Sequence, residues 1–489
     1  MSQYWILVAI LLPVLGGIGI PLLPFRKRKW ILTYIEIVVL LTSAVVVALL
    51  LGGKTEDFHV VRFVNDLSIS FKIDGMTMVF AGLVAILWPL ATLYAFEYMT
   101  HEKHEKPFFM FYTMTYGITL GIAFASNIMS MYFFYELLTL VTVPLVMHTM
   151  TREAILAVRK YLYFSIGGAA FALMGMVFLI IYGDTSEFVM GGVFSPTTLR
   201  QHSDLLLWIY LFSFMGFGVK SAIFPLSSWL PQAGVAPTPV TALLHAVAVV
   251  NAGAFAIIRL TYYSFGTDFL QGTWVQNVCM VLAMFTIVYG CSRAVKETHI
   301  KRRLAWSTVS NLSYIIFGAT IMTPLGLVGA LTHFVFHGFM KITAFFCAGA
   351  FMHQTGKKHI YEMNGMGKKM KIVFGTFAVA SLSLMGVPGF AGFISKWNLT
   401  QAAVHSDNPT AYAGIVCLIL SALLTAIYML SVVCRAFFPA TEEKCEEPVG
   451  DPGWQMCLPM LICAVATVLL GLFSAPLIEF FRAIAHGMF

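Results

Sequence analysis

Seven side chains that can gain or lose a proton stand inside long apolar stretches of this 489-residue sequence. A charge at the centre of a lipid bilayer costs at least about 2.5–3.5 kcal/mol, so each of these residues needs a reason. Carboxyl, amine and imidazole groups in such positions are typical of proton relays. The sequence therefore predicts a buried proton path. Its candidate residues are Glu136, Lys220, His245, His333, His337, Lys341 and Lys396.

Glu136 follows an aromatic run, Met131-Tyr-Phe-Phe-Tyr, in the middle of an apolar stretch. Two interpretations stay open. The carboxylate can form a structural ion pair that holds helices together, or it can be a proton or ion station whose proton affinity depends on a partner that moves. In the second interpretation, Lys220 is the partner that Glu136 keeps protonated.

Two lysines lie beside predicted helix interruptions. Pro225 follows Lys220 by five residues, and a proline inside a helix removes a hydrogen bond and clashes with the preceding turn. We therefore expect the helix to break just after Lys220. The segment around Pro388, followed by Lys396, repeats this arrangement. Interrupted helices occur in membranes where they are buried in protein or line a polar cavity, and two matching interruptions indicate an internal repeat.

His333, His337 and Lys341 have the spacing i, i+4, i+8, which places them on one helix face about 6 Å apart per step. Two histidines at this spacing can also bind a metal, but no carboxylate or cysteine lies near them in sequence. A proton wire is the preferred interpretation. His245 is ambiguous, because a single histidine in an apolar helix is commonly a hydrogen-bonded core residue; its place near the interruptions favours a relay role.

The composition indicates that lipid is the solvent around this chain. Apolar residues make up 59% of the chain and charged residues 11%, with a mean hydropathy of +0.83. Soluble domains carry about 25% charged residues, so soluble, disordered, collagenous and disulfide-rich classes are excluded. The eight cysteines contain no CxxC pair and are interpreted as core packing, without an iron–sulfur or zinc site. We expect no cofactor in this chain.

A helix that crosses a bilayer needs about 20 mostly apolar residues, and fourteen stretches meet this requirement. The twelfth is long enough to suggest a break. The sequence thus predicts an all-α integral membrane protein with about 14 transmembrane helices. The expected spans are 4–23, 31–52, 76–97, 108–126, 128–149, 161–182, 205–225, 239–262, 274–292, 304–322, 325–352, 372–405, 411–434 and 455–476.

The basic residues predict the orientation of these spans. With the N-terminus outside, the inner loops hold 21 of the 30 lysines and arginines, Arg26, Lys301 and Lys444 among them, and the outer loops hold five. Inner loops normally carry this excess of positive charge. Both termini are then outside. The net charge of +7 is explained by the topology and does not indicate nucleic acid. Arg259, near the outer end of its span, is expected to extend its charge towards water.

The chain reads as a single membrane domain, 1–489, because no loop is long enough to fold separately. Alternating residues in 58–64 and 67–73 predict a small outer hairpin. Five spans in each half of the repeat make the two halves inverted relative to each other. The expected parts are 1–106 (helices 1–3), 107–263 (first repeat, helices 4–8), 274–436 (second repeat, helices 9–13) and 455–489 (helix 14).

Taken together, the motifs resemble one family over roughly residues 70–435. It is the antiporter-like membrane-subunit family, which covers the proton-pumping subunits of respiratory complex I, their counterparts in membrane-bound hydrogenases, and the large subunits of Mrp-type cation/proton antiporters. The motifs are Glu136 in its aromatic setting, Gly218-Val-Lys220-Ser-Ala-x-Phe-Pro225, Trp229-Leu-Pro231-x-Ala233, Ala236-Pro-Thr-Pro239-Val-x-Ala-Leu-Leu-His245, Lys301-Arg302-x-Leu-Ala305-x-Ser307, His333-x3-His337-x3-Lys341 and Pro388-x3-Gly392-Phe-x-Ser-Lys396.

The resemblance implies fourteen helices with two inverted five-helix repeats, broken in helices 7 and 12. It also implies that Glu136, Lys220 and Lys396 are proton-path residues. Two features depart from the family. Many relatives carry a lysine in the eighth helix where this chain has Asn251, so the central relay is expected to use His245. Lys396 and His245 resemble the most distal complex I pump, but no long lateral helix follows in this sequence.

Three functions stay open after this reasoning. The preferred one is a non-redox, proton-translocating subunit of a complex I-like oxidoreductase or hydrogenase. The alternative is a subunit of an Mrp-type Na⁺/H⁺ antiporter without a redox partner. A structural membrane anchor is the third. The expected partners are other membrane subunits, the lipid bilayer and H⁺ or Na⁺, and the expected location is an energy-coupling membrane, the prokaryotic plasma membrane.

Overall fold

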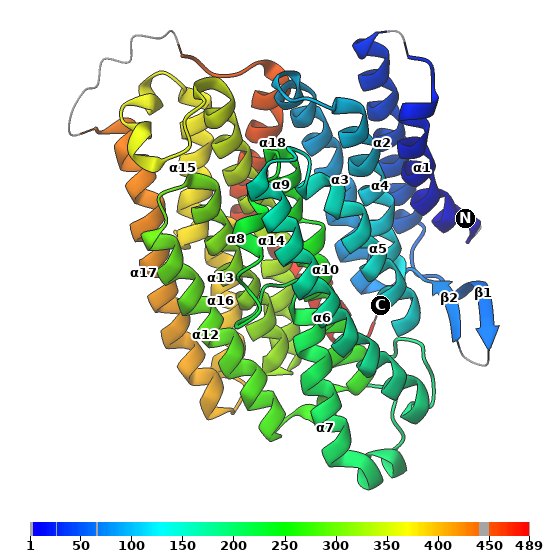
Figure 1. The fold of residues 1–489 in the computed structure, drawn as a ribbon. Coiled ribbons are helices and arrows are strands. Elements are labelled where there is room, and N and C mark those ends of the chain that lie inside the picture. The colour runs from blue at the N-terminus through cyan, green and yellow to red at the C-terminus, as the bar shows by residue number, and fades with distance from the viewer. Residues whose placement is uncertain (1–2, 26, 65–66, 440–448, 489) are drawn as a thin grey trace.

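The computed structural model describes residues 3–25, 27–64, 67–439 and 449–488. Long helices lie side by side in one bundle, and the single hairpin projects from its edge beside the N-terminal helices (Figure 1). The prediction of a helical membrane protein is confirmed at this level. Arg26, Lys444 and Cys445, which entered the charge and cysteine counts, lie outside the described residues.

The N-terminal part contains three long helices and the hairpin. The two strands pair antiparallel, as the alternating residues predicted. Asp74 caps the third helix by accepting a hydrogen bond from the Thr77 backbone N–H at 2.9 Å. The elements are α1 (Tyr4–Leu22), α2 (Arg28–Leu51), β1 (Phe58–Val64), β2 (Leu67–Phe71), α3 (Gly75–Tyr98) and the short 3-10 helix η1 (Met99–His101).

The middle of the chain carries the first group of candidate residues. Asn127, Thr151 and Ser195 cap the starts of α5, α6 and α7 with their side chains, which explains where these helices begin. The elements are α4 (Glu105–Phe124), α5 (Ile128–Val146), α6 (Arg152–Tyr182), α7 (Pro196–Gly218), α8 (Leu230–Ala233), α9 (Thr238–Ala246), α10 (Val249–Ile258) and the π-helix η2 (Arg259–Phe265).

The remaining helices complete the bundle, with α17 at the side opposite to α1 (Figure 1). The helix α14 packs against α3, α9, α10, α13, α15, α16, α18 and α19 and is therefore the central helix. The elements are α11 (Thr267–Leu270), α12 (Trp274–Lys296), α13 (Ile300–Ile321), α14 (Pro324–Thr355), η3 (Ile360–Met363), η4 (Met366–Lys368), α15 (Lys371–Met385), α16 (Ala391–Val404), α17 (Pro409–Phe437), α18 (Trp454–Leu472) and α19 (Ala475–Ala485).

Twelve helical segments among the described residues are long and apolar enough to cross a membrane, two fewer than the fourteen stretches of the sequence. The two that differ are the interrupted ones. The helix α7 begins with nine mostly polar residues, 196–204, and ends at Gly218. The twelfth stretch is divided into α15, with 15 residues, and α16, with 14, each too short to span alone.

Burial separates central from peripheral helices. The apolar window of α13 and that of the segment Thr238–Phe265 are 100% buried inside the protein, and that of α14 is 94% buried. The corresponding values are 39% for α1 and 33% for α17, so these helices lie at the surface of the bundle. A helix without lipid contact can carry polar side chains, because protein groups satisfy them. The central helices are where most candidate residues lie.

The eighth expected span, 239–262, contains an interruption that the sequence did not predict. The helix α9 ends at Ala246, the chain leaves helical geometry at Val247 and Ala248, and α10 begins at Val249. The span then continues into the π-helix η2. No proline or glycine lies at this break, so no local signal marks it.

Candidate functional site

Lys220 lies in the irregular segment between α7 and α8, because α7 ends before the lysine and not after it as expected. Its side chain is 1% exposed. The ammonium donates a hydrogen bond to the backbone carbonyl of Tyr135 and lies 3.4 Å from the centre of the Tyr135 ring. The Tyr135 hydroxyl donates to the Phe217 carbonyl at 2.8 Å, at the end of α7. Tyr135 thus positions Lys220, a role that the sequence did not reveal.

Glu136 is the next residue of α5 and acts electrostatically on Lys220. The two side chains form no salt bridge in this structure: the ammonium is bound by Tyr135. The Glu136 side chain is half-buried, and its Oε1 atom is shielded from solvent without a hydrogen-bond partner among the described residues. The carboxylate is therefore near its expected partner but not engaged with it.

His245 occupies the last turn of α9, directly before the interruption of the eighth span. Its ring is fully buried and stacks on Phe345 with centroids 4.8 Å apart. Neither ring nitrogen has a hydrogen-bond partner among the described residues. Asn251, on α10, donates to the Ala246 carbonyl at 3.0 Å and so bridges the break. Because the helix is broken between them, the distance from His245 to Asn251 cannot be calculated from the rise of a continuous α-helix.

Lys341 lies on the central helix α14 with an exposure of 0%. Its ammonium donates to the Ser307 hydroxyl at 2.6 Å and to the Leu304 carbonyl at 3.3 Å, both on α13. Ser307 in turn shares a hydrogen bond of 2.6 Å with the Tyr428 hydroxyl on α17. The lysine thus begins a chain of hydroxyl groups that crosses two helices.

The two histidines of α14 lie in line with Lys341, as their spacing predicted. The rings of His333 and His337 are 5.9 Å apart and both residues are fully buried. His333 Nδ1 shares a hydrogen bond of 2.9 Å with the Ser395 hydroxyl on α16. His337 lies one helical turn from both His333 and Lys341, and neither of its ring nitrogens has a hydrogen-bond partner among the described residues.

Lys396 follows Ser395 on α16 and reaches back across the interruption at Pro388. Its ammonium donates to the carbonyls of Leu384 and Met385 at 2.8 and 2.9 Å, the last carbonyls of α15. The negative end of a helix dipole favours a cation in this position. The chain closes here because Gly392 has no Cβ: a Cβ would lie 1.8 Å from the Ser383 carbonyl oxygen.

Lys301 is a further buried lysine, which the sequence analysis counted among the inner loops. It is 3% exposed and donates to the Ala236 carbonyl at 2.6 Å. A polar cavity of about 280 Å³ leads to it, lined by His101, Glu102 and His353 among others. Arg302 and Arg303 follow Lys301 directly, so no local signal in the sequence marked Lys301 as a residue that enters the core.

These contacts divide the candidate residues into two groups. The first is Glu136 and Lys220 at α5 and the segment after α7. The second is the row on α14, in which the ring of His337 lies 5.9 Å from that of His333 and His333 shares a hydrogen bond with Ser395, the residue before Lys396. No hydrogen bond or ring contact in the described part of the chain joins His245 to either group or to Lys301. Three buried lysines, Lys220, Lys301 and Lys341, and the half-buried Lys396 share one property: each ammonium is held by carbonyl or hydroxyl oxygens.

Arg259 was expected to reach water, and this expectation is wrong. The side chain is 0% exposed and forms two hydrogen bonds of 2.7 Å with the carboxylate of Asp74. The rings of Phe188, Phe255 and Tyr263 surround the guanidinium at 4.7–5.2 Å. This pair joins the start of α3 to the π-helix η2. Its partners are 185 residues apart, which is why the sequence did not reveal it.

Potential metal ligands and cysteine thiols also occur in the described part of the chain. No group of three or more His, Cys, Asp or Glu that could hold a metal occurs within the described ranges. The seven cysteines described are free thiols. Five are buried, which agrees with core packing, but Cys417 is half-buried and Cys434 is exposed.

Comparison with known families decides the assignment of the chain. Residues 125–425 match the family described as "NADH:quinone oxidoreductase/Mrp antiporter, TM", and residues 63–109 match "NADH-Ubiquinone oxidoreductase (complex I), chain 5 N-terminus". The chain belongs to the first of these families. This confirms the resemblance to antiporter-like membrane subunits.

Similar proteins come from both branches of the family. NADH-quinone oxidoreductase subunit N of Desulforudis audaxviator is 29% identical, with 90% of this chain and 89% of that subunit covered. Na⁺/H⁺ antiporter subunit A1 of Staphylococcus aureus is 27% identical, with 95% of this chain but only 61% of that subunit covered. The present chain thus spans less than two thirds of the antiporter subunit.

Solved structures share the fold over almost the whole chain. A chain of the Mrp complex from Dietzia sp. superimposes with a TM-score of 0.85 at 20% identity, covering 99% of this chain and 97% of the other. A chain of the membrane-bound sulfane sulfur reductase, an archaeal respiratory membrane complex, gives 0.86 at 21% identity with the same coverage. At these identities the likeness shows the fold alone.

Proposed function

We propose that this chain is a proton-translocating, non-redox subunit in the membrane arm of a complex I-like oxidoreductase or hydrogenase. The observation that carries the proposal is a set of three buried lysines and one half-buried lysine, each held by neutral oxygens, together with three buried histidines. Such groups can exchange protons in a protein interior, whereas a purely structural anchor has no need of them. Family membership supports the same reading.

The driving step is an electrostatic rearrangement around Lys220. When Glu136 approaches the ammonium, the charged form of the lysine is favoured; when Glu136 moves away, burial favours the neutral amine. Burial can change the proton affinity of a lysine by about 4–7 kcal/mol. Moving one proton against about 150 mV costs about 3.5 kcal/mol. One rearrangement of this pair is therefore large enough to drive one proton.

The second group of residues carries the proton onwards. The polar cavity beside Lys301 supplies protons from the aqueous side, and His245, whose buried ring nitrogens have no hydrogen-bond partner among the described residues, passes them to the row on α14. His333 and Ser395 deliver them to Lys396. The energy comes from partner subunits, which contain the redox chemistry. The similarity of this chain to NAD(P)H-quinone oxidoreductase chain 4 of Trichodesmium erythraeum, at 27% identity, supports a redox complex as the parent.

We further propose that α7 and the pair α15–α16 complete fourteen crossings, with both termini outside in the prokaryotic plasma membrane. The parts 107–263 and 274–436 would be two inverted repeats. The excess of basic residues in alternate loops of the expected topology and the two interruptions, each with a lysine, support this arrangement. Other membrane subunits are the expected partners.

An Mrp-type Na⁺/H⁺ antiporter subunit is the second candidate function. The staphylococcal antiporter relative covers 95% of this chain and favours it. Purification of the tagged protein from its native membrane, with identification of the subunits that accompany it, separates the two. Iron–sulfur or nickel-containing subunits support the redox complex. Small hydrophobic antiporter subunits alone support the alternative.

The proposal is tested at Lys220 by proton uptake into vesicles that contain the reconstituted parent complex. Lys220→Ala should abolish uptake without preventing assembly. Lys220→Arg should also fail, because a guanidinium does not release its proton in proteins. Lys106→Arg, an exposed exchange of the same kind, is the control. Normal pumping by Lys220→Arg would show that deprotonation of residue 220 is not part of the cycle.

A further inference from the structure

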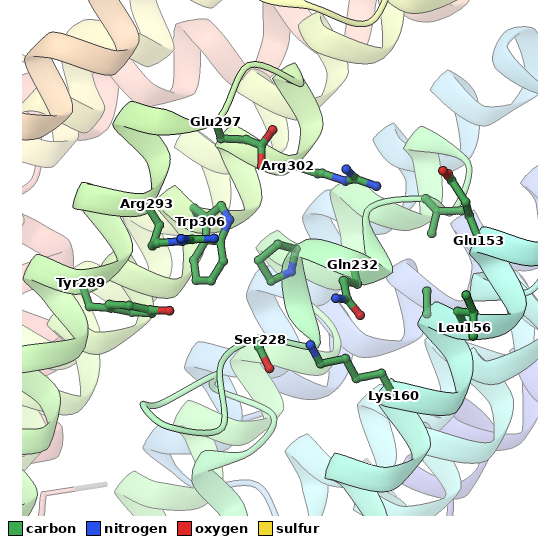
Figure 2. A pocket seen from close by; sticks show the side chains of 13 residues that line it. Glu153, Leu156, Lys160, Ser228, Gln232, Tyr289, Arg293, Glu297, Arg302 and Trp306 are labelled. Atoms are coloured by element: carbon green, nitrogen blue, oxygen red, sulfur yellow. The ribbon is translucent and has the colours of Figure 1, made fainter.

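A polar cavity of about 440 Å³ lies apart from the proton path, at the end of the bundle where α6 faces α12 and α13. Figure 2 shows Tyr289, Arg293 and Trp306 on one wall and Lys160 on the opposite wall, with Ser228 between them. The wall on α6 belongs to the proposed first repeat and the other wall to the second. The cavity therefore spans the junction of the two halves.

Three cations line this cavity and have no acidic partner. Lys160, Arg293 and Arg302 make no salt bridge within the described residues, although Glu153 and Glu297 lie on the same rim. Arg293 stacks on Trp306 with its guanidinium carbon 5.1 Å from the ring centre. Glu297 turns towards the chain and accepts hydrogen bonds from the backbone of residues 298 and 299. The cations are thus available to an anion.

An apolar groove of about 280 Å³ continues the cavity along the same face of α6. Phe164, which begins the groove, lies one helical turn beyond Lys160, whose ammonium is 6.0 Å from the Phe164 ring. Gly167 leaves the groove open, since a Cβ at this position would meet nothing within 4 Å. Val219 and Leu226, from the irregular segment that holds Lys220, form the opposite side.

We propose that the cavity and the groove together form a binding site for one acidic phospholipid. The phosphate headgroup lies among Lys160, Arg293 and Arg302, and an acyl chain lies in the groove between α6 and the segment after α7. Charge complementarity favours an anionic headgroup, because the cations have no acidic partner. Continuity with an apolar groove open to the bilayer favours a lipid over a soluble anion. The bound lipid would brace the interrupted seventh span against both halves of the bundle.

The test is native mass spectrometry of the full chain purified in detergent, titrated with dioleoylphosphatidylglycerol or dioleoylphosphatidylcholine. The first lipid should bind more tightly. Arg293→Gln and Arg302→Gln should each weaken its binding about fivefold, the effect of one cation near a lipid phosphate. Arg159→Gln, an exposed cation that does not line the cavity, is the matched control.

The apolar half of the site is tested independently. Gly167→Leu fills the groove and should weaken phosphatidylglycerol binding about fourfold for each methylene displaced. Gly375→Leu, at a second open glycine on α15, is the control. Equal binding of both lipids, with no effect of the arginine variants, would overturn the proposal. Glycerol phosphate that binds as tightly as the lipid, with no effect of Gly167→Leu, would also overturn it in favour of a soluble anion. Both readouts are independent of proton translocation.

Discussion

Replacing Asp74 by Asn tests what the buried ion pair with Arg259 contributes to stability. Asparagine keeps the volume and can still cap α3 at Thr77, so the change isolates the pair. Arg259 then remains charged, fully buried and without a carboxylate. Removing one partner of a buried pair costs about 3–5 kcal/mol, because the other charge is left uncompensated. We expect this loss in the free energy of unfolding at pH 7.

The double variant Asp74→Asn with Arg259→Met separates pair formation from burial. Methionine removes the stranded charge and keeps an unbranched apolar side chain beside the three aromatic rings. The double variant should therefore lose less stability than the sum of the two single variants. Asp57→Asn is the matched control: Asp57 is 3.9 Å from Lys72 and partly exposed, so its removal should cost at most about 1 kcal/mol.

The assay is equilibrium unfolding in mixed detergent micelles followed by circular dichroism. Burial by itself raises the pKa of Asp74, but the charge and hydrogen bonds of Arg259 outweigh this effect and bring the pKa down to about 2. A depressed carboxyl pKa stabilises the fold above the unfolded value of about 3.9, and this stabilisation is lost as pH falls towards 2. The wild type should therefore lose more stability than Asp74→Asn between pH 4 and 2. An exposed ion pair contributes about 0–1 kcal/mol. If Asp74→Asn lost no more stability than Asp57→Asn, to within about 0.5 kcal/mol, the reasoning would be refuted.

Three further predictions concern proton uptake by vesicles with the reconstituted complex. Glu136→Gln should reduce uptake strongly and Glu136→Asp partly; wild-type uptake by the glutamine variant would leave Glu136 a structural role. His245→Ala should impair uptake severely. Adding Asn251→Lys should partly restore it, since a lysine at residue 251 can still donate to the Ala246 carbonyl and can also exchange a proton. Full uptake by His245→Ala would show that His245 is an ordinary core histidine. Ser307→Ala should slow uptake about tenfold through the lost hydrogen bond to Lys341, and an unchanged rate would contradict this.

Local sequence signals predicted those features that depend on neighbouring residues. Length and hydropathy located twelve of the fourteen expected spans, and alternation in 58–64 and 67–73 located the hairpin, whose second strand ends at Phe71. Prolines marked the irregular segments near Pro225 and Pro388. The spacing of His333, His337 and Lys341 placed them in one row because an α-helix has a fixed period. These inferences needed no knowledge of distant contacts.

Features that depend on distant contacts could not be predicted. The break at Val247 and Ala248 has no proline or glycine and is bridged by the Asn251 amide. Arg259 looked like a residue that reaches water, because its partner Asp74 belongs to another helix. Lys301 was counted with the loops for a similar reason: its acceptor, the Ala236 carbonyl, is 65 residues away.

The protein buries its cations in two chemically different ways, and the difference fits the proposed function. Arg259 is held by the Asp74 carboxylate, so the two charges compensate each other. Lys220, Lys301 and Lys341 are held by carbonyl and hydroxyl oxygens, which carry partial charge only. A lysine that gives up its proton to leave a neutral amine among these oxygens leaves no buried anion uncompensated. A lysine that lost its proton beside a buried carboxylate would leave that carboxylate without a counter-ion. Neutral acceptors therefore suit a group that must release a proton, and a carboxylate suits one that must not.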